Sequence, residues 1–337
     1  MSVRRPVTMR DVAIAAGVSP KTVSNVVNGY VHVSEETRTR VQQHVEALGY
    51  RPQAVGRQLR RGRTGAIALA VPGIAVPYFA DLAAHLVGAC RERGLTVLVE
   101  QTDGDVERER EVAAGFPVRF ADGLIFSPLA MPSDELAAPR HDTPMVLLGE
   151  HGEDADVDRI GIDSVAIAVE ATEHLLADGR RRIAMLGHKE GSHKSVMEQR
   201  IEGYTRALRA AGLPAHQAMV RTVVEWDREY GEVATDALLA EHPDVDAVFA
   251  ATDTLAIGAL RSLHRHGRRV PDDVAVIGVD DVPEAAYCTP TLTTVAIDRA
   301  FIAASALDLL TSRLDEPDLP PRTVLAPHHL VRRETSP

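Results

Sequence analysis

Cysteine, aromatic side chains and long uncharged apolar runs are all scarce in this sequence. The two cysteines, Cys90 and Cys288, lack the spacing of a metal site, so we expect two reduced thiols. No segment approaches the roughly 20 uncharged apolar residues that a membrane-spanning helix needs. The charged N-terminus has no apolar stretch behind it that would indicate a secretory signal. These absences favour a cytoplasmic globular protein with no membrane partner.

Patterns typical of catalysis and metal binding are also missing. The sequence contains no phosphate-binding loop, no dinucleotide fingerprint and no serine in a nucleophile elbow. The histidines of 264–266 and 328–329 lack partners at metal-ligand spacing. Adjacent aspartates such as Asp280 and Asp281 have diverging side chains, so they do not form an acid/base pair. We therefore expect no catalytic residues, no metal and no cofactor.

The charge is unevenly distributed along the chain. The net charge is −11, yet residues 1–63 contain eleven Lys/Arg against four Asp/Glu, a balance of +7. The remainder carries −18. A basic segment on an acidic body indicates a polyanion that binds the segment and is repelled by the body.

The basic segment reads as three short helices. Thr8 can cap a helix that Gly17 ends, and Ser19 can cap a second helix with Pro20 in its first position. Ser34 can cap a third helix with acidic residues in its first turn. Apolar residues recur at helical spacing in all three, which predicts a minimal three-helix core.

The start of the second helix carries side chains suited to DNA. Its valines form the buried face, which leaves Pro20, Lys21, Ser24 and Asn25 facing outward. Lysine can donate to guanine or phosphate, and asparagine can form two hydrogen bonds with adenine. The second helix of a helix-turn-helix unit enters the major groove in this way. The alternative is that these are ordinary solvated positions.

The first 52 residues contain five distinctive motifs: Val7–Ala13, Ala16–Ser19, Thr22–Ser24, Val33–Arg38 and Leu48–Pro52. Together they resemble the DNA-binding domain of the lactose-repressor (LacI/GalR) family. The resemblance implies a DNA-binding headpiece over residues 1–51. Asn25 departs from the family pattern, which usually has arginine or another strong base reader there, so we expect adenine where arginine would select guanine. The headpiece residues expected to bind DNA are Thr8, Ser19, Pro20, Lys21, Thr22, Ser24, Asn25 and Asn28.

The segment Pro52–Leu59 follows, within a linker over 52–63. Gly56 weakens a helix by about 1 kcal/mol, and eight residues are marginal as a free helix, so we expect it to fold only on DNA. In the LacI/GalR family this is the hinge helix of the minor groove, which implies that Leu59 is an apolar wedge between base pairs. The alternative is a basic linker with an incidental leucine. The further DNA contacts expected here are Arg51, Gln53, Ala54 and Arg57.

Residues 64–337 alternate apolar strands with helices, which predicts an α/β body of parallel sheets covered by helices. Two such series indicate two lobes, and the arrangement resembles the type I periplasmic-binding-protein fold. We expect the first lobe at about 64–162 and 294–322, and the second at about 163–293 and 323–337. The expected strands are 66–71, 95–99, 123–127, 145–148, 183–186, 219–223, 247–251, 274–279, 295–297 and 322–325.

Ligands of such sheets lie at the carboxyl ends of strands. Tyr78 and Phe79 follow the first strand and match positions that wall the effector pocket in the family; they could instead fill the core. Arg200 matches the family arginine that reaches the effector, and its planar fork suits hydroxyl, carboxylate or ring-oxygen acceptors. The alternative for Arg200 is a surface position.

Three further residues complete the expected effector site. Trp226, the only tryptophan, matches a family position that stacks on the ligand, and its flat face suits a sugar or a purine equally. Asp280 ends a strand and resembles the family aspartate that binds effector hydroxyl or amine groups. Asp253 either contacts the ligand or caps a helix. Lys194 is a weaker rim candidate.

These patterns predict a ligand-responsive transcription regulator that binds a near-palindromic operator as a homodimer. We expect a repressor of a sugar-catabolic operon, with a purine-responsive regulator as the alternative effector class. A solute-binding protein of a transporter shares the expected body fold, but the basic headpiece argues against it. An α/β enzyme with a DNA-binding arm is the other alternative.

Overall fold

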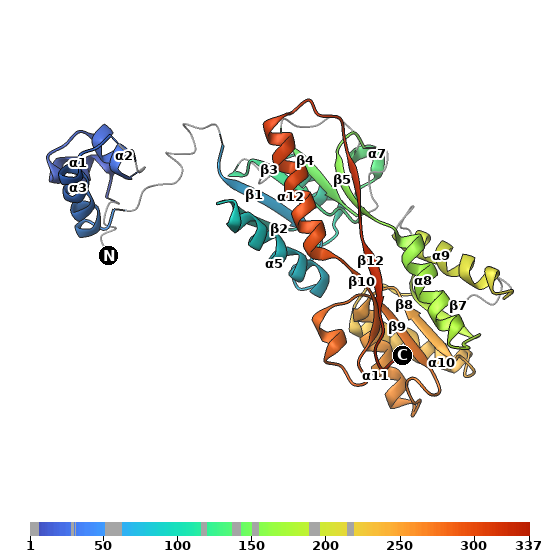
Figure 1. The fold of residues 1–337 in the computed structure, drawn as a ribbon. Helices are drawn as coiled ribbons and strands as arrows, with labels where there is room; N and C mark the ends of the chain where they lie inside the picture. Colours follow the sequence, from blue (N-terminus) through green and yellow to red (C-terminus); the bar gives the residue numbers. More distant parts are fainter. Residues whose placement is uncertain are drawn as a thin grey trace. The chain divides into compact units, whose positions relative to one another are not determined.

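The computed structural model describes the chain in two units, Met1–Thr64 and Gly65–Pro337. The coloured ribbon of Figure 1 follows the chain through both units. The described residues are 7–27, 30, 32–50, 63–115, 120–136, 143–149, 155–188, 196–213 and 219–337. Within these ranges no helix is long and apolar enough to cross a membrane.

The first unit is the expected three-helix headpiece. Its helices are α1 (Met9–Ala16), α2 (Pro20–Val27) and α3 (Glu35–Ala47). Thr8 and Asp11 form a capping box, with the Thr8 amide donating to Asp11 Oδ2 over 2.8 Å. Gly17 ends α1 in the left-handed conformation, with φ 64°. The small core contains Val12, Ala13, Ala16, Val23, Val26, Val41 and Tyr50.

The first lobe of the second unit has a six-stranded, fully parallel sheet in the order β11-β5-β4-β3-β1-β2. Alternate residues of β1 belong to two separate apolar clusters, so both faces of the sheet are covered. Helices α5 (Pro77–Glu92) and α12 (Arg299–Asp315) cover one face, and α6 (Val106–Ala113) and α7 (Ser133–Leu136) the other. The strands are β1 (Ala66–Val71), β2 (Thr96–Gln101), β3 (Gly123–Phe126), β4 (Met145–Leu148), β5 (Asp158–Ile162) and β11 (Thr323–Ala326).

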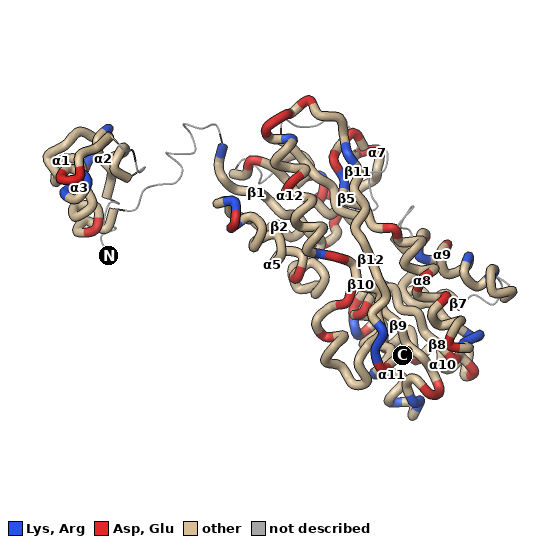
Figure 2. The backbone as a smooth tube through the Cα atoms, viewed as in Figure 1, with Lys and Arg blue, Asp and Glu red and all other residues tan. Residues whose placement is uncertain are grey.

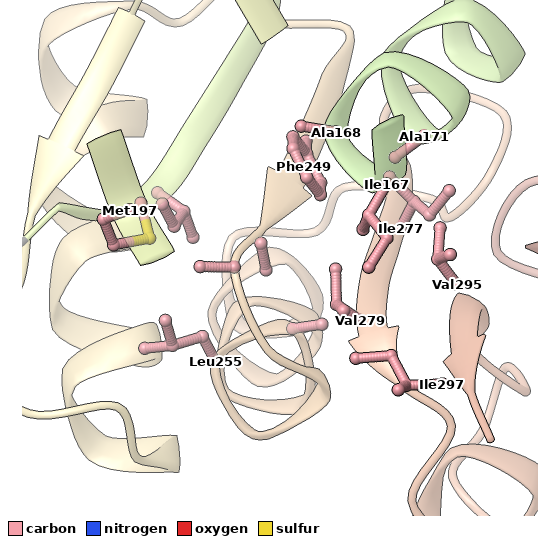
Figure 3. Close-up of a cluster of buried hydrophobic side chains, with 14 of the residues drawn as sticks. Ile167, Ala168, Ala171, Met197, Phe249, Leu255, Ile277, Val279, Val295 and Ile297 are labelled. Carbon is pink, nitrogen blue, oxygen red and sulfur yellow. The ribbon is translucent and has the colours of Figure 1, made fainter. Parts of the chain in front are cut away.

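The second lobe has a six-stranded sheet in the order β12-β10-β9-β8-β6-β7, parallel except for β12. Figure 3 shows apolar side chains of helix α8 packed beside those of β8 and β9. The helices form two packed pairs, α8 (Ser164–Ala177) with α9 (Val196–Ala210) and α10 (Arg228–Glu241) with α11 (Asp253–Arg265). The strands are β6 (Ile183–His188), β7 (Met219–Thr222), β8 (Ala247–Ala250), β9 (Ala275–Asp280), β10 (Thr293–Ile297) and β12 (His328–Val331), with a short 3-10 turn η3 (Pro283–Ala286) after β9.

The expected lobe boundaries near the C-terminus are wrong by one strand each. The sequence assigned 294–322 to the first lobe, but β10 pairs with β9 and β12 in the second sheet. It assigned 323–337 to the second lobe, but β11 pairs with β5 in the first sheet. The chain therefore passes between the sheets after β5, after β10 and after β11.

Buried polar contacts determine which of the two sheets β11 joins, and the pattern of apolar residues in the strands does not reveal these contacts. Asp158 at the start of β5 has no exposed surface and binds the side chains of Arg313 and Arg322 over 3.1 to 3.2 Å. Its Oδ1 also accepts a hydrogen bond from the Arg322 amide over 2.9 Å. Because Arg322 directly precedes β11, this carboxylate holds that strand in the first sheet. The sequence analysis did not predict β5 itself.

We expect Asp158→Asn to lower the free energy of unfolding by roughly 3 kcal/mol, because it leaves two arginines around a buried site without their counter-charge. Urea unfolding of the full chain measures this change. Asp308→Asn is the matched control. Asp308 lies on α12, as Arg313 does, and forms an exposed ion pair with Arg93, so its substitution should change stability by less than about 0.5 kcal/mol. Equal effects of the two substitutions would contradict the structural role of Asp158.

Candidate functional site

The start of α2 presents only part of the predicted DNA-reading set. The Ser19 side chain caps the helix by accepting from the Thr22 amide over 3.1 Å, and the Ser19 and Thr22 hydroxyls lie 2.9 Å apart. Pro20 and Lys21 are exposed, and Asn25 is half-buried. This surface can approach a DNA groove with the Lys21 ammonium and the Asn25 side-chain amide facing the bases.

Ser24 differs from the prediction that it faces outward. Only 7% of its surface is exposed, and it belongs to the buried face of α2 with Val23 and Val26. Ser24 lies about 100° around the helix from Val23, at the border of the apolar stripe, where its short side chain is covered. Thr8 is half-buried, and its hydroxyl takes part in the capping box.

Seven predicted site residues fall outside the described residues, and their assignment stays a prediction. They are Asn28, Arg51, Gln53, Ala54, Arg57, Leu59 and Lys194.

The predicted effector residue Asp280 ends β9 in an unusual conformation. Its φ is 112°, and the φ of the next residue, Asp281, is 54°. Non-glycine residues rarely adopt such angles, and they do so at functional sites when their surroundings hold them there. The Asp280 side chain is buried, with 8% of the residue exposed. Burial raises the pKa of its carboxyl to about 6, although the charges of Arg200 and Arg299 act in the opposite direction.

Arg200 is also buried, with 4% of its surface exposed, which contradicts the alternative of a surface arginine. It lies on α9, and its Nη1 donates to the carbonyl of Ala251, the residue after β8. Its Nε has no hydrogen-bond partner within the described part of the chain. A buried unpaired N–H next to a carboxylate is suited to an acceptor group of a ligand.

Trp226 follows β7 and is half-buried. Its indole N–H donates to the carbonyl of Gly187 over 2.8 Å, which fixes the ring against the end of β6. Gly187 has φ 127°, and a Cβ there would overlap the side chain of Ala251. Because the indole N–H already donates within the protein, a ligand would contact Trp226 through its ring face.

Tyr78 and Phe79 lie in the first turn of α5, and both are half-buried against the main core. Their rings meet edge to face, with centroids 5.1 Å apart and an angle of 82°. The guanidinium carbon of Arg299 lies 6.0 Å from the centroid of Tyr78. This contact and those of Arg299 with Asp280 connect the pair to the end of β9.

Asp253 is not the helix cap that one of the two predictions made it, and its contact with a ligand stays a prediction. The cap of α11 is Thr252, whose hydroxyl accepts from the Leu255 amide. Asp253 has no exposed surface, and its two oxygens accept from Thr294 Oγ1 over 2.6 Å and from the Val282 amide over 2.9 Å. Burial raises the pKa of Asp253 well above its ordinary value, and the nearby Asp280 raises it further. Its contacts are with the chain itself, so it holds the segment after β9.

Sequence reasoning missed two arginines beside these residues. Arg299 donates to the carbonyls of Asp280 and Asp281, and Arg333 forms an ion pair with Asp281 over 2.7 Å. Arg299 comes two residues after β10, so the rule that ligand residues follow strands could have found it. Arg333 comes two residues after β12, a strand that the sequence did not predict. A groove of about 600 Å³ lies elsewhere, along α8 beside Glu170, His174 and Arg206, and none of the predicted effector residues lines it.

Charge also distinguishes the two units. Figure 2 shows Asp and Glu over many elements of both lobes, in agreement with the −18 of residues 64–337. The headpiece carries the opposite sign, as a DNA-binding surface requires.

Comparisons with known proteins agree with this arrangement. Residues 8–53 match the family of bacterial regulatory proteins, lacI family, and residues 172–336 match the periplasmic binding protein-like domain. The chain is 33% identical over 331 residues to the ribose operon repressor of Halalkalibacterium halodurans, covering 98% of this chain and 97% of that protein. It is 34% identical over 346 residues to the HTH-type transcriptional regulator CelR of Thermobifida fusca, covering 98% and 99%.

Solved structures show the same similarity. A lac repressor dimer bound to operator and the anti-inducer ONPF has a TM-score of 0.86 at 27% identity, covering 98% of this chain and 99% of that one. A putative LacI-family regulator from Sanguibacter keddieii has a TM-score of 0.76 at 40% identity, covering 82% and 99%. A helix-turn-helix headpiece joined to a two-lobed ligand-binding body defines a DNA-binding transcription regulator. The chain belongs to the LacI family of these regulators, which confirms the family resemblance and the fold class.

We expect Asp280→Asn to stabilise the folded protein at pH 7.5 by up to about 3 kcal/mol, at about 1.4 kcal/mol for each pKa unit. The pKa of Asp280 rises from an ordinary 3.8 to about 6, so the ionised form is disfavoured in the folded state. Below pH 4 the carboxyl is protonated in both states, so the gain should shrink as the pH falls from 6 to 4. Asparagine also tolerates positive φ.

Unfolding midpoints at pH 7.5 and pH 4.5 measure this difference. The control, Asp273→Asn, should have the opposite sign, because Arg269 lowers the pKa of that exposed carboxyl to about 2 and the ionised form is favoured. A gain from Asp280→Asn that is the same at both pH values would contradict the effect of burial.

Proposed function

We propose that this regulator is a repressor of a sugar-catabolic operon, which binds a near-palindromic operator as a homodimer and changes its operator affinity when a sugar binds at the end of β9. The observation that carries this proposal is the buried pair of Asp280 and Arg200. Trp226 is connected to Arg200 through Gly187, which lies against Ala251, the residue whose carbonyl Arg200 binds. A carboxylate and a guanidinium can bond several hydroxyls of one sugar, and an aromatic face packs against sugar C–H groups.

The relatives support the choice of effector class. The ribose operon repressor is 33% identical to this chain, and a solved structure of CelR with cellobiose is 30% identical with a TM-score of 0.71. The second candidate is a purine effector, because the PurR repressor of Vibrio atlanticus is 30% identical over 331 residues. The face of Trp226 suits a purine ring as well as a sugar.

The alternatives to a regulator lose support. The lacI-family match over residues 8–53 supplies a DNA-binding domain, which a transporter's solute-binding protein does not need. For an enzyme acting at the end of β9, the neighbouring buried carboxylates Asp253 and Asp280 would have to act as an acid and a base. The protein itself occupies both oxygens of Asp253, so we propose that the chain has no catalytic role. We propose that the protein acts in the cytoplasm at the nucleoid, because that is where its operator DNA lies.

The effector class is tested by titrating pentoses, hexoses, disaccharides and purine bases against the fluorescence of Trp226, followed by operator binding with every compound that changes the signal. We expect a sugar to change both. Arg200→Ala and Asp280→Asn should abolish the response, while operator binding without effector persists. Arg209→Ala is the matched control, since Arg209 is exposed on the same helix and should leave the response unchanged. A response to purines alone would replace the sugar proposal.

Operator reading is tested by selecting preferred sequences from a randomised operator pool with the wild-type protein and with Asn25→Arg. We expect the substitution to replace adenine by guanine at one position of each half-site, since arginine bonds guanine O6 and N7. Lys21→Ala serves as the comparison. If Lys21 binds phosphate, the loss should be similar for all sequences and the salt dependence should become weaker. Identical selected sequences for wild type and Asn25→Arg would show that Asn25 reads no base.

A further inference from the structure

Arg299 is the first residue of α12, directly after the chain passes from the second sheet into the first lobe. Its guanidinium makes three bonds at once. Nε pairs with Asp81 Oδ2 over 2.5 Å, Nη1 donates to the carbonyl of Asp280, and Nη2 donates to the carbonyl of Asp281 over 2.9 Å. Asp81 belongs to α5 of the first lobe, whereas the two carbonyls belong to the second. One side chain thus bonds both lobes.

The end of this contact on the second lobe is rigid. The Asp281 amide donates to Thr294 Oγ1 over 3.3 Å, and the Asp281 carboxylate pairs with Arg333. Asp253 binds the next amide, that of Val282. Residues 280–282 are therefore fixed from three sides, and the positive φ angles of Asp280 and Asp281 persist because these bonds hold them.

The end on the first lobe lies beside the aromatic pair. Asp81 is one helical turn from Tyr78, and the guanidinium of Arg299 lies near the Tyr78 ring. His85 Nε2 lies 3.6 Å from the same oxygen, Asp81 Oδ2, that accepts from Arg299. The Arg299 side chain is only 10% exposed. A rotation of one lobe against the other would break at least one of its three bonds, and a buried donor without a partner is costly.

We propose that Arg299 is a positioning residue that transmits effector binding at Asp280 to helix α5 of the first lobe. The planar fork of arginine holds two adjacent carbonyls with a fixed geometry, which lysine does not reproduce. A ligand that shifts Asp280 changes the position of both carbonyls and so of the guanidinium, and Asp81 passes this shift to α5. The coupling part of this inference rests on the proposed function; the contact itself does not.

The first experiment needs no effector. Hydrogen exchange of the full chain is measured for wild type, Arg299→Gln, Arg299→Lys and the matched control Arg93→Gln. Arg93 caps the end of α5 and pairs with Asp308 of α12 over 2.5 Å, so this control removes an ion pair within the first lobe. We expect the amides of Asp281 and Val282 to exchange roughly tenfold faster in Arg299→Gln and to a smaller extent in Arg299→Lys. Arg93→Gln should leave them unchanged.

The second experiment separates positioning from simple destabilisation. Asp81→Asn keeps the bonds of Arg299 to the second lobe but removes its charged anchor on the first. We expect the effector affinity without DNA to stay within about twofold of wild type, while the effector-induced change in operator affinity falls toward one. Arg93→Gln should retain both values. A general loss of stability would lower operator and effector binding together.

The outcomes are distinct. Unchanged exchange in Arg299→Gln overturns the inference whether or not an effector is known. Faster exchange with an intact effector response in Asp81→Asn overturns the coupling role. If wild type responds to no sugar or purine, the proposed function fails, and the exchange experiment still decides the role of Arg299 at the end of β9.

Discussion

The buried carboxylate of Asp253 fixes the segment after β9, and the candidate effector site depends on that fixed segment. By accepting from Thr294 and the Val282 amide, it ties α11 to β10 and to the residues that follow Asp280. Gly278 has no side chain because a Cβ would overlap this carboxylate. The cost of burying Asp253 is visible in its raised pKa, and the result is an Asp280 held in a conformation that few aspartates adopt.

Two sheets joined by three crossings can change their relative orientation without unfolding either lobe. The apolar cores and the Asp158 cluster keep each sheet intact, so we expect a ligand to act by selecting among lobe orientations. Arg299 lies at one of the crossings and bonds both sides. The fixed end of β9 and the Arg299 contact at the crossing would act together in the proposed coupling, because a fixed ligand contact transmits a shift to its neighbours better than a mobile one.

The headpiece and the body carry opposite charges, and both affect how the protein binds DNA. The +7 of residues 1–63 attracts the phosphate backbone, and the −18 of the remainder opposes contact of the body with DNA. Affinity should then fall steeply with salt, since phosphate contacts release counterions. We expect sequence selectivity to depend on the few side chains at the start of α2, where Lys21 is exposed and Thr22 and Asn25 are half-buried.

The sequence by itself determined the headpiece, the strand-helix alternation and the family. Caps such as Thr8 and Ser19, and apolar strands such as β1, are local signals, since each depends on residues within one or two turns. Only the tertiary structure decided the sheet to which β10 and β11 belong, the burial of Ser24, and the roles of Asp253 and Arg299. These depend on contacts between residues far apart in the chain, such as Asp158 with Arg322 or Asp81 with Arg299. Periodicity carries no information about such pairs, because a charged side chain in a pattern looks the same whether it faces water or a distant partner.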